Sequence, residues 1–557
     1  MVRKLLRTLA APVRGLHQAA YLLAVLTLGS QALALIRDRI FADTFGASET
    51  LDLYYAAFKV PDIVFALVAS LVSAYVLIPR ITALGAKEGR ELMSQTASFL
   101  FIGGGLISLV LAAFAPILLF LLFPQFAGTP RADEFVLLSQ ILLLQPILLG
   151  LSSILTSVTQ VKRRFLLYAL SPVLYNVGII LGALVFYPLY GLPGVGIGVL
   201  IGALAHVVIH IPIVARAHLL PRLKVPSWNV LLPVMRDSAP RSLALGVGAV
   251  TTLLLASLAA RTGEGGIAIF SLASNLEAVP LSLIGAAYAT AAFPVLSEQA
   301  GKTDLFRATL AAAARHLIFW SAVILVLAVV LRAHIVRIVL GTGAFDWDDT
   351  RLTAAVLGIL VFALITQGLV LLFSRAYYAA GRSWNPLLIQ VAGLFVSSVS
   401  AYGFLAAADS VPLFRYFIES LLRVEDVPGS GILFIALGFL AGQLVMGVIA
   451  LTTLRSVAPG VAASLIRPFS EGLAAAILGG SAAYAALALM GHIAPLTTLA
   501  AVFTEALVAG IVGITVSAAI LVLLENQEFR DLFSALKKLT SRALRPYGAY
   551  QNDGENS

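Results

Sequence analysis

The sequence predicts an all-α integral membrane protein with fourteen transmembrane helices. Three observations support this fold class: the composition, a series of long apolar stretches, and the distribution of basic residues between them. Of the 557 residues, 60% are hydrophobic and 12% are charged, and the mean hydropathy is +0.97. A soluble chain carries about twice that share of charge. Soluble, disordered and nucleic-acid-binding proteins are therefore excluded.

Each predicted helix is an apolar stretch of about 20 residues, the length that crosses the hydrocarbon core of a bilayer. The fourteen stretches centre near Leu26, Val68, Ile107, Leu144, Ile180, Leu204, Val250, Ile284, Ile324, Ile365, Val396, Leu440, Leu478 and Ile511. The first stretch runs on into Arg37-Asp38-Arg39 and lacks a small-residue cleavage site. We therefore expect it to stay in the protein as a membrane helix rather than be removed as a signal peptide.

The basic residues predict that both termini lie in the cytoplasm. With fourteen spans and the N-terminus inside, roughly 27 of the 37 Lys and Arg residues fall on the cytoplasmic side, as the positive-inside rule requires. One helix more or fewer in the middle would remove this bias. After the last span, Phe529, Leu532, Phe533, Leu536 and Leu539 recur at helical spacing beside basic residues, which predicts an amphipathic helix on the membrane surface. Gln551–Ser557 are expected to be a disordered tail.

An internal repeat predicts how the helices are organised. Val60-Pro61 opens a helix that ends at Pro79, and Val279-Pro280 opens one that ends at Pro294, a shift of about 215–220 residues. Six spans separate the copies, so both have the same orientation in the membrane, which is a parallel repeat. The predicted domains are an N-terminal six-helix lobe (1–225), a C-terminal six-helix lobe (226–457), two further helices (458–524) and the cytoplasmic amphipathic segment with its tail (525–557).

Ionisable side chains at membrane depth are costly, and each is a candidate functional residue. Arg37 can form a forked contact with an anionic substrate, or it can pair with Asp38 or Asp52 to fix a helix end. Lys59 can contact the same substrate or extend to the interface. Glu277 is a candidate proton or cation site, or a buried carboxyl satisfied beside Asn275.

Two other patterns have simpler structural explanations. His206 and His210 are one turn apart, which would suit a metal pair, but hydrogen bonding between helices is the favoured interpretation. Gly194, Gly198 and Gly202 at four-residue spacing predict a ridge where two helices approach closely.

No enzyme motif is present. The sequence has no Gly-rich loop that ends in Gly-Lys-Ser/Thr, no His-Glu-x-x-His and no Gly-x-Ser-x-Gly. Cysteine is absent, which excludes thiolate and Cys-type metal chemistry. We expect a transporter without cofactor or metal that uses an ion gradient or the membrane potential, with the coupling ion left open.

The first spans carry motifs that resemble the opening of the MurJ/MviN lipid II flippases. These are Ser30-Gln-Ala-Leu-Ala-Leu-Ile-Arg37-Asp38, Phe45-Gly46-Ala47, Asp52 and Ala57-Phe58-Lys59-Val60-Pro61. The resemblance returns at Asn275-Leu276 with Pro280, at Phe293-Pro294, and at Ser374-Arg375-Ala-Tyr-Tyr378-Ala-Ala-Gly381. It covers most of the chain, and this family belongs to the multidrug/oligosaccharidyl-lipid/polysaccharide exporter superfamily.

The resemblance implies a function in peptidoglycan synthesis, and so in cell wall biogenesis and cell shape. It implies flipping of an undecaprenyl-pyrophosphate-linked sugar precursor, such as lipid II, across the bacterial cytoplasmic membrane by alternating access. The implied partners are this anionic lipid-linked oligosaccharide, membrane lipids and cell-wall synthesis enzymes. The implied substrate-binding residues are Arg37, Lys59, Asp52, Gln31 and Asn275. The functions left open are export of another lipid-linked oligosaccharide, cation-coupled drug export, and a non-transporting membrane scaffold.

The chain departs from the family pattern at most of its cavity arginines. Gln31 and Asn275 each stand where the family has an arginine, Phe65 and Ala66 replace two more, and Ser70-Leu-Val-Ser-Ala74 replaces a Glu-Gly-Ala-Phe-Ser motif. A pyrophosphate in a low-dielectric site needs cationic partners. Three explanations follow: Lys59 and Arg39 take over, the substrate is less charged, or transport has been lost.

Single cysteines test the predicted topology cleanly, because the native chain contains none. Ala86→Cys and Arg382→Cys should react with a membrane-impermeant thiol reagent only from the cytoplasm, and Ser48→Cys and Thr350→Cys only from outside. Reaction of Ser48→Cys from the cytoplasmic side would reverse the predicted orientation.

Overall fold

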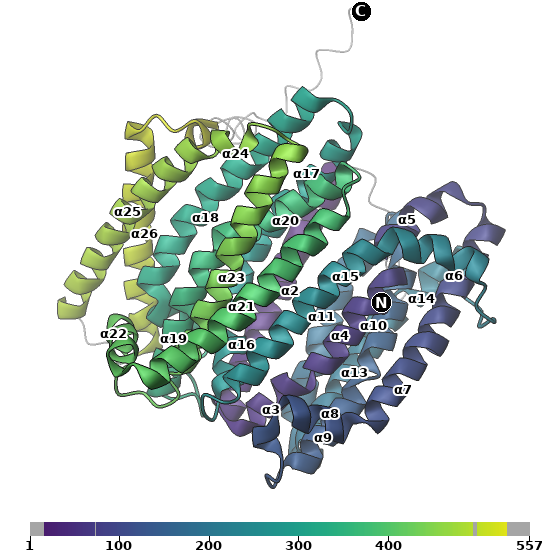
Figure 1. The fold of residues 1–557 in the computed structure, drawn as a ribbon, viewed down its shortest axis with the longest axis horizontal. Helices are drawn as coiled ribbons and strands as arrows, with labels where there is room; N and C mark the ends of the chain where they lie inside the picture. Colours follow the sequence, from purple (N-terminus) through teal and green to yellow (C-terminus); the bar gives the residue numbers. More distant parts are fainter. Residues whose placement is uncertain (1–15, 73, 494–497, 532–557) are drawn as a thin grey trace, which may run out of the picture. The chain divides into compact units, whose positions relative to one another are not determined.

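Helices make up most of the part that the computed structural model describes, which comprises residues 16–72, 74–493 and 498–531 (Figure 1). Leu532, Phe533, Leu536, Leu539 and the predicted tail Gln551–Ser557 lie outside these residues. Phe529 lies in the helical stretch 527–531, where the described part ends.

The helices divide between two compact units. The first unit comprises Met1–Val279, Val336–Ala363 and Gly381–Ile449, and the second comprises Pro280–Ile335, Leu364–Ala380 and Ala450–Ser557. The predicted lobes, with boundaries at residues 225 and 457, remain a prediction.

The first half of the chain contains α2 (Leu16–Phe45), α3 (Glu49–Ala57), α4 (Lys59–Leu67), η1 (Ala69–Val72), α5 (Ala74–Ala83), α6 (Ala86–Phe99), η2 (Leu100–Gly104), α7 (Gly105–Ala113), α8 (Ala115–Leu122), η3 (Pro124–Phe126), α9 (Ala132–Leu142), α10 (Gln145–Val161), α11 (Phe165–Leu181), η4 (Gly182–Phe186), α12 (Tyr187–Tyr190), α13 (Leu192–Val208), α14 (Ile211–Arg216), α15 (Trp228–Ala259) and α16 (Gly266–Pro280). The second half contains η5 (Leu281–Ala286), α17 (Ala287–Glu298), α18 (Thr303–Val339), α19 (Trp347–Leu360), η6 (Val361–Ala363), α20 (Leu364–Ala379), α21 (Trp384–Ser410), α22 (Pro412–Leu422), α23 (Ile432–Thr453), η7 (Leu454–Ser456), α24 (Val461–Ser464), α25 (Ile466–Ile493) and α26 (Leu499–Leu523).

Consecutive helices combine into membrane-length spans, which confirms the predicted all-α integral membrane fold. Within the described residues, 13 helical segments are long and apolar enough to cross a membrane. Each contains one of the predicted span centres from Val68 to Ile511. The remaining predicted span, centred near Leu26, falls in α2, which is 30 residues long, so the exact count of fourteen remains a prediction.

The predicted glycine ridge is confirmed as a close helix contact in the first unit. Gly198 of α13 packs against Gly178 and Gly182 on α11 and η4, and a Cβ atom at Gly198 would overlap backbone atoms of both. Gly202 meets the backbone of Tyr175 in the same way. Small residues allow such close approach between membrane helices, where dispersion contacts replace the hydrophobic effect as the source of association.

Charged side chains fix helix ends around the turn between α2 and α3. The Asp52 carboxylate accepts hydrogen bonds from the backbone N–H groups of Gly265 (2.8 Å) and Ala268 (2.7 Å), at the start of α16. The Arg39 guanidinium donates to the carbonyl oxygens of Ile338 (2.7 Å) and Val339 (3.3 Å), at the end of α18. Each charge therefore satisfies backbone groups that a helix end leaves without partners, and each has the sign that the helix dipole favours there.

Replacing Asp52 should destabilise the protein through the start of α16. Asp52→Ala leaves two buried N–H donors without an acceptor, which should lower the free energy of unfolding by about 1–3 kcal/mol. Asp52→Asn keeps one acceptor oxygen and should cost less. Unfolding of both variants in detergent checks this, and an alanine variant as stable as the wild type would rule out the capping role.

Candidate functional site

Arg37 and Asp38 form an ion pair within the first unit. The Arg37 Nη2 and Nε atoms donate to Asp38 Oδ1 over 2.7 and 3.0 Å. The Asp38 side chain is 2% exposed, while that of Arg37 keeps 19% of its surface accessible. The pair therefore places a guanidinium at membrane depth without leaving either charge uncompensated, which is the condition for burying charge at tolerable cost.

Two asparagines complete the hydrogen bonding of this pair. Arg37 Nη1 donates to Asn176 Oδ1 of α11 over 3.0 Å, and Asn275 Nδ2 of α16 donates to Asp38 Oδ2 over 3.1 Å. The Asn176 amide donates in turn to the carbonyl oxygen of Pro172 (3.1 Å). Three helices thus meet through one polar network, and Arg37 and Asn275, both predicted site residues, are brought together by Asp38.

A second pair of charges lies in the same neighbourhood. Lys59 opens α4, and its ammonium group interacts electrostatically with Asp62, three residues later on the same helix. Tyr54 and Tyr175 interact electrostatically with both Arg37 and Asp62. We call the set Arg37, Asp38, Lys59, Asp62, Tyr54, Tyr55, Tyr175, Gln145, Asn176 and Asn275 the polar cluster.

Two buried polar atoms of the cluster have no hydrogen-bond partner among the described residues. They are the Tyr55 hydroxyl, which interacts electrostatically with Arg37 and Asp38, and Gln145 Oε1. The amide of Gln145 donates through Nε2 to the Tyr175 hydroxyl (2.9 Å), and Gln145 is only 7% exposed. A buried acceptor without a partner is costly, so these groups are suited to contact a polar ligand.

Lys59 is the cation of the cluster with the most freedom to bind. Among the described residues no hydrogen-bond or ion-pair partner within 4 Å of its ammonium group is found, and its side chain is half-buried. Arg39 was the other predicted replacement for the family arginines, but its guanidinium donates its hydrogen bonds to backbone carbonyl oxygens at the end of α18.

Of the other predicted site residues, Asp52 serves the fold, and Gln31 and Glu277 lie on α2 and α16, the helices that carry Arg37 and Asn275. Asp52 caps α16, as described above, and its predicted role in substrate binding remains a prediction. Gln31 is partly exposed on α2, nearly two turns before Arg37. Glu277 is 5% exposed on α16, two residues beyond Asn275, and it is engaged with a partner.

The paired histidines connect two helices, as favoured from the sequence. His206 Nδ1 lies 2.6 Å from Ser152 Oγ, and the His210 ring lies 2.9 and 3.1 Å from the hydroxyl groups of Thr156 and Thr159. These contacts join α13 and the residues that follow it to α10. Over the ranges that the structure describes, no group of three or more His, Asp or Glu side chains is placed to hold a metal ion.

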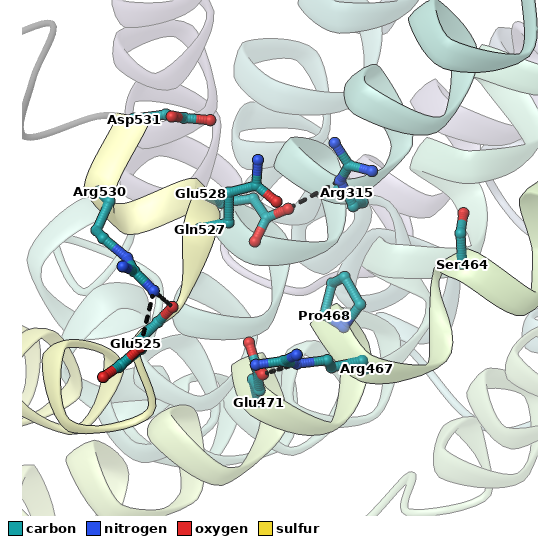
Figure 2. A pocket seen from close by; sticks show the side chains of 10 residues that line it. All are labelled: Arg315, Ser464, Arg467, Pro468, Glu471, Glu525, Gln527, Glu528, Arg530 and Asp531. Atoms are coloured by element: carbon teal, nitrogen blue, oxygen red, sulfur yellow. Dashed lines mark hydrogen bonds and ion pairs between the residues drawn. The ribbon is translucent and has the colours of Figure 1, made fainter.

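A charged pocket of about 520 Å³ lies in the second unit, where the chain leaves α26 (Figure 2). Glu528 points toward Arg315 of α18 and pairs with it over 2.9 Å, and Asn526 donates to Glu471 of α25 over 2.8 Å. Arg467 pairs with Glu471, and Arg530 with Glu525. Because its charges pair with one another, this pocket is explained as a clamp that holds the end of α26 against α18 and α25.

Sequence reasoning missed several members of the cluster. Asn176, Gln145 and Tyr175 were not predicted because they carry no charge, although a polar amide within an apolar span is a similar signal. Taken together, the cluster offers a forked cation, a half-buried ammonium group and neutral hydrogen-bonding groups. This chemistry suits recognition of an anionic or sugar-bearing group, and it contains no activated nucleophile.

Comparisons with known proteins identify relatives of this chain. A model of the lipid II flippase MurJ family matches residues 41–413. The probable lipid II flippase MurJ of Thermotoga maritima is 27% identical over 413 residues, which cover 72% of this chain and 83% of that protein. The lipid II flippase MurJ of Burkholderia cenocepacia is 22% identical over 403 residues, 70% of this chain and 78% of that protein.

Solved structures show the same fold. A lipid II flippase MurJ in an inward closed conformation superposes with a TM-score of 0.72 at 19% identity, covering 92% of this chain and all of that one. An inward-facing multidrug resistance MATE family transporter of the MOP superfamily superposes with a TM-score of 0.61 at 16% identity, covering 78% of this chain and 95% of that one. Because the family model spans two thirds of the sequence, this multi-pass membrane protein belongs to the MurJ lipid II flippase family.

Proposed function

We propose that this protein flips an undecaprenyl-pyrophosphate-linked sugar precursor, the peptidoglycan precursor lipid II, from the inner to the outer leaflet. The observation that carries the proposal is the match of residues 41–413 to the lipid II flippase family. The polar cluster supports it, because Arg37 and Lys59 are cations at membrane depth that a pyrophosphate can use. We place the protein in the bacterial cytoplasmic membrane with both termini in the cytoplasm, and we assign it no enzymatic activity.

Alternating access accounts for two sets of contacts in the first unit. Toward the predicted outer side, Asp52 joins the α2–α3 segment to α16. Toward the predicted cytoplasmic side, Ser70 Oγ donates to Ser242 Oγ of α15 over 2.7 Å, and Arg80 pairs with Asp237 and donates to the carbonyl oxygen of Pro233. A carrier that opens to each side in turn must break these two sets of contacts alternately, with an ion gradient or the membrane potential as its energy source.

Complementation tests this function in cells depleted of their own lipid II flippase. The wild-type protein should restore growth, and lipid II headgroups should become accessible on the outer face. Arg37→Ala should abolish rescue, because losing a charge-assisted contact costs about 1.5–3 kcal/mol, roughly a tenfold to hundredfold loss of affinity. Lys59→Ala should weaken it.

The matched control is Arg307→Ala, which removes a half-exposed arginine on α18 outside the polar cluster and should rescue fully. Wild-type protein that inserts in the membrane but neither rescues growth nor exposes lipid II would contradict the proposal. Rescue by Arg37→Ala would instead show that the anionic group of the substrate does not depend on Arg37 for binding.

A further inference from the structure

The formal charges of the polar cluster cancel. Arg37 and Lys59 face Asp38 and Asp62, whereas the proposed substrate carries an anionic diphosphate. A buried anion is tolerated only where opposite charge compensates it. An empty site that is already neutral would therefore become net negative when the headgroup enters.

Three of the five N–H groups of the cluster arginine, including its Nε–Nη2 side, are already engaged before a ligand arrives. Its Nε and Nη2 atoms are on Asp38, and its Nη1 atom is on Asn176. If the guanidinium turns its fork to a phosphate, the Asp38 carboxylate, 2% exposed, loses its cation. Asn275, the other partner of Asp38, is a neutral amide and cannot replace that charge.

One proton lowers the net negative charge of the occupied site and frees the arginine at the same time. When Asp38 is protonated, the buried carboxylate becomes neutral, and Arg37 is released with its positive charge intact. The amide of Asn275 can donate to either form of the carboxyl group or, turned over, accept from the acid form, so this neighbour tolerates both states.

We infer that the polar cluster binds the anionic headgroup together with one proton, and that Asp38 is the group that takes it up. This inference rests on the proposed function, and it deepens that function by assigning a co-ligand to the substrate site. The groups that face Asp38 are Arg37 on its own helix, Asn275 on α16, and Tyr54 and Tyr55 on α3. Farther out lie Lys59, Asp62 and Tyr175, with Glu277 on the same helix as Asn275. The proton comes from solvent, and no covalent bond of the substrate changes.

Calorimetric titration of lipid II into the purified full-length protein in nanodiscs tests this coupling. Repeating the titration in buffers of different ionisation enthalpy counts the protons that move with the ligand. We expect the wild type to take up about one proton per lipid II near neutral pH, and its affinity to fall by up to about tenfold per unit rise in pH. An undecaprenyl lipid without phosphate should move no proton.

Two variants assign the proton to its residue. Asp38→Asn mimics the neutral acid, so it should bind lipid II without proton uptake and more tightly than the wild type at alkaline pH. Asp304→Asn, which alters an aspartate whose side chain is 99% exposed and lies outside the cluster, should behave like the wild type. The number of protons taken up is measured on the wild type alone. It therefore tests whether lipid II binding is coupled to proton uptake even if Asp38→Asn folds poorly.

The outcomes separate the inference from the function on which it rests. Tight binding of lipid II without proton uptake by the wild type would overturn the inference and leave the proposed function standing. Proton uptake that persists in Asp38→Asn and disappears in Asp62→Asn would overturn the assignment to Asp38. Failure of the wild type to bind lipid II at any pH would count against the proposed function itself.

Discussion

The ion pair between Arg37 and Asp38 is the interaction on which the site depends. An isolated guanidinium at membrane depth is expensive, and a carboxylate that is 2% exposed is equally so. Pairing the two adjacent side chains allows both to sit within α2 while Asn176 and Asn275 tie them to neighbouring helices. The same pairing means that the arginine is not freely available to a substrate.

The charged residues around the first two spans have two different roles, in the fold and in the polar cluster. Asp52 and Arg39 complete helix ends, so their energetic contribution is to the fold. Arg37 and Asp38 compensate each other, and Lys59 with Asp62 forms a looser pair in which the ammonium group remains able to bind. The polar cluster is therefore neutral in formal charge when it is empty. That neutrality constrains how it can accept an anion.

The membrane fold could be predicted from the sequence because its signals are local. A span is a run of about 20 apolar residues, and the stretches centred from Val68 to Ile511 all became helical spans. The glycine ridge was equally readable, because Gly194, Gly198 and Gly202 mark one face of one helix. The Arg37–Asp38 pair was one of the alternatives left open, since the two residues are neighbours in the chain.

The partners of these residues could not be predicted, for a physical reason. Asn176 is 139 residues from Arg37, and the N–H groups that Asp52 accepts are more than 210 residues away. Which side chains meet at such separations depends on the rotation and depth of each helix, and apolar runs specify neither. Arg39 shows the same limit, because it resembled a substitute for the missing arginines and instead holds the end of α18.

The most direct test of this account is the separation of Arg37 Nη2 from Asp38 Oδ1 in a structure of the protein with a lipid-linked diphosphate bound. It is 2.7 Å in the present structure. We predict that the hydrogen bond breaks in the complex and that a phosphate oxygen takes the place of the carboxylate on the guanidinium. An intact Arg37–Asp38 pair, with the diphosphate bound elsewhere in the protein, would contradict it.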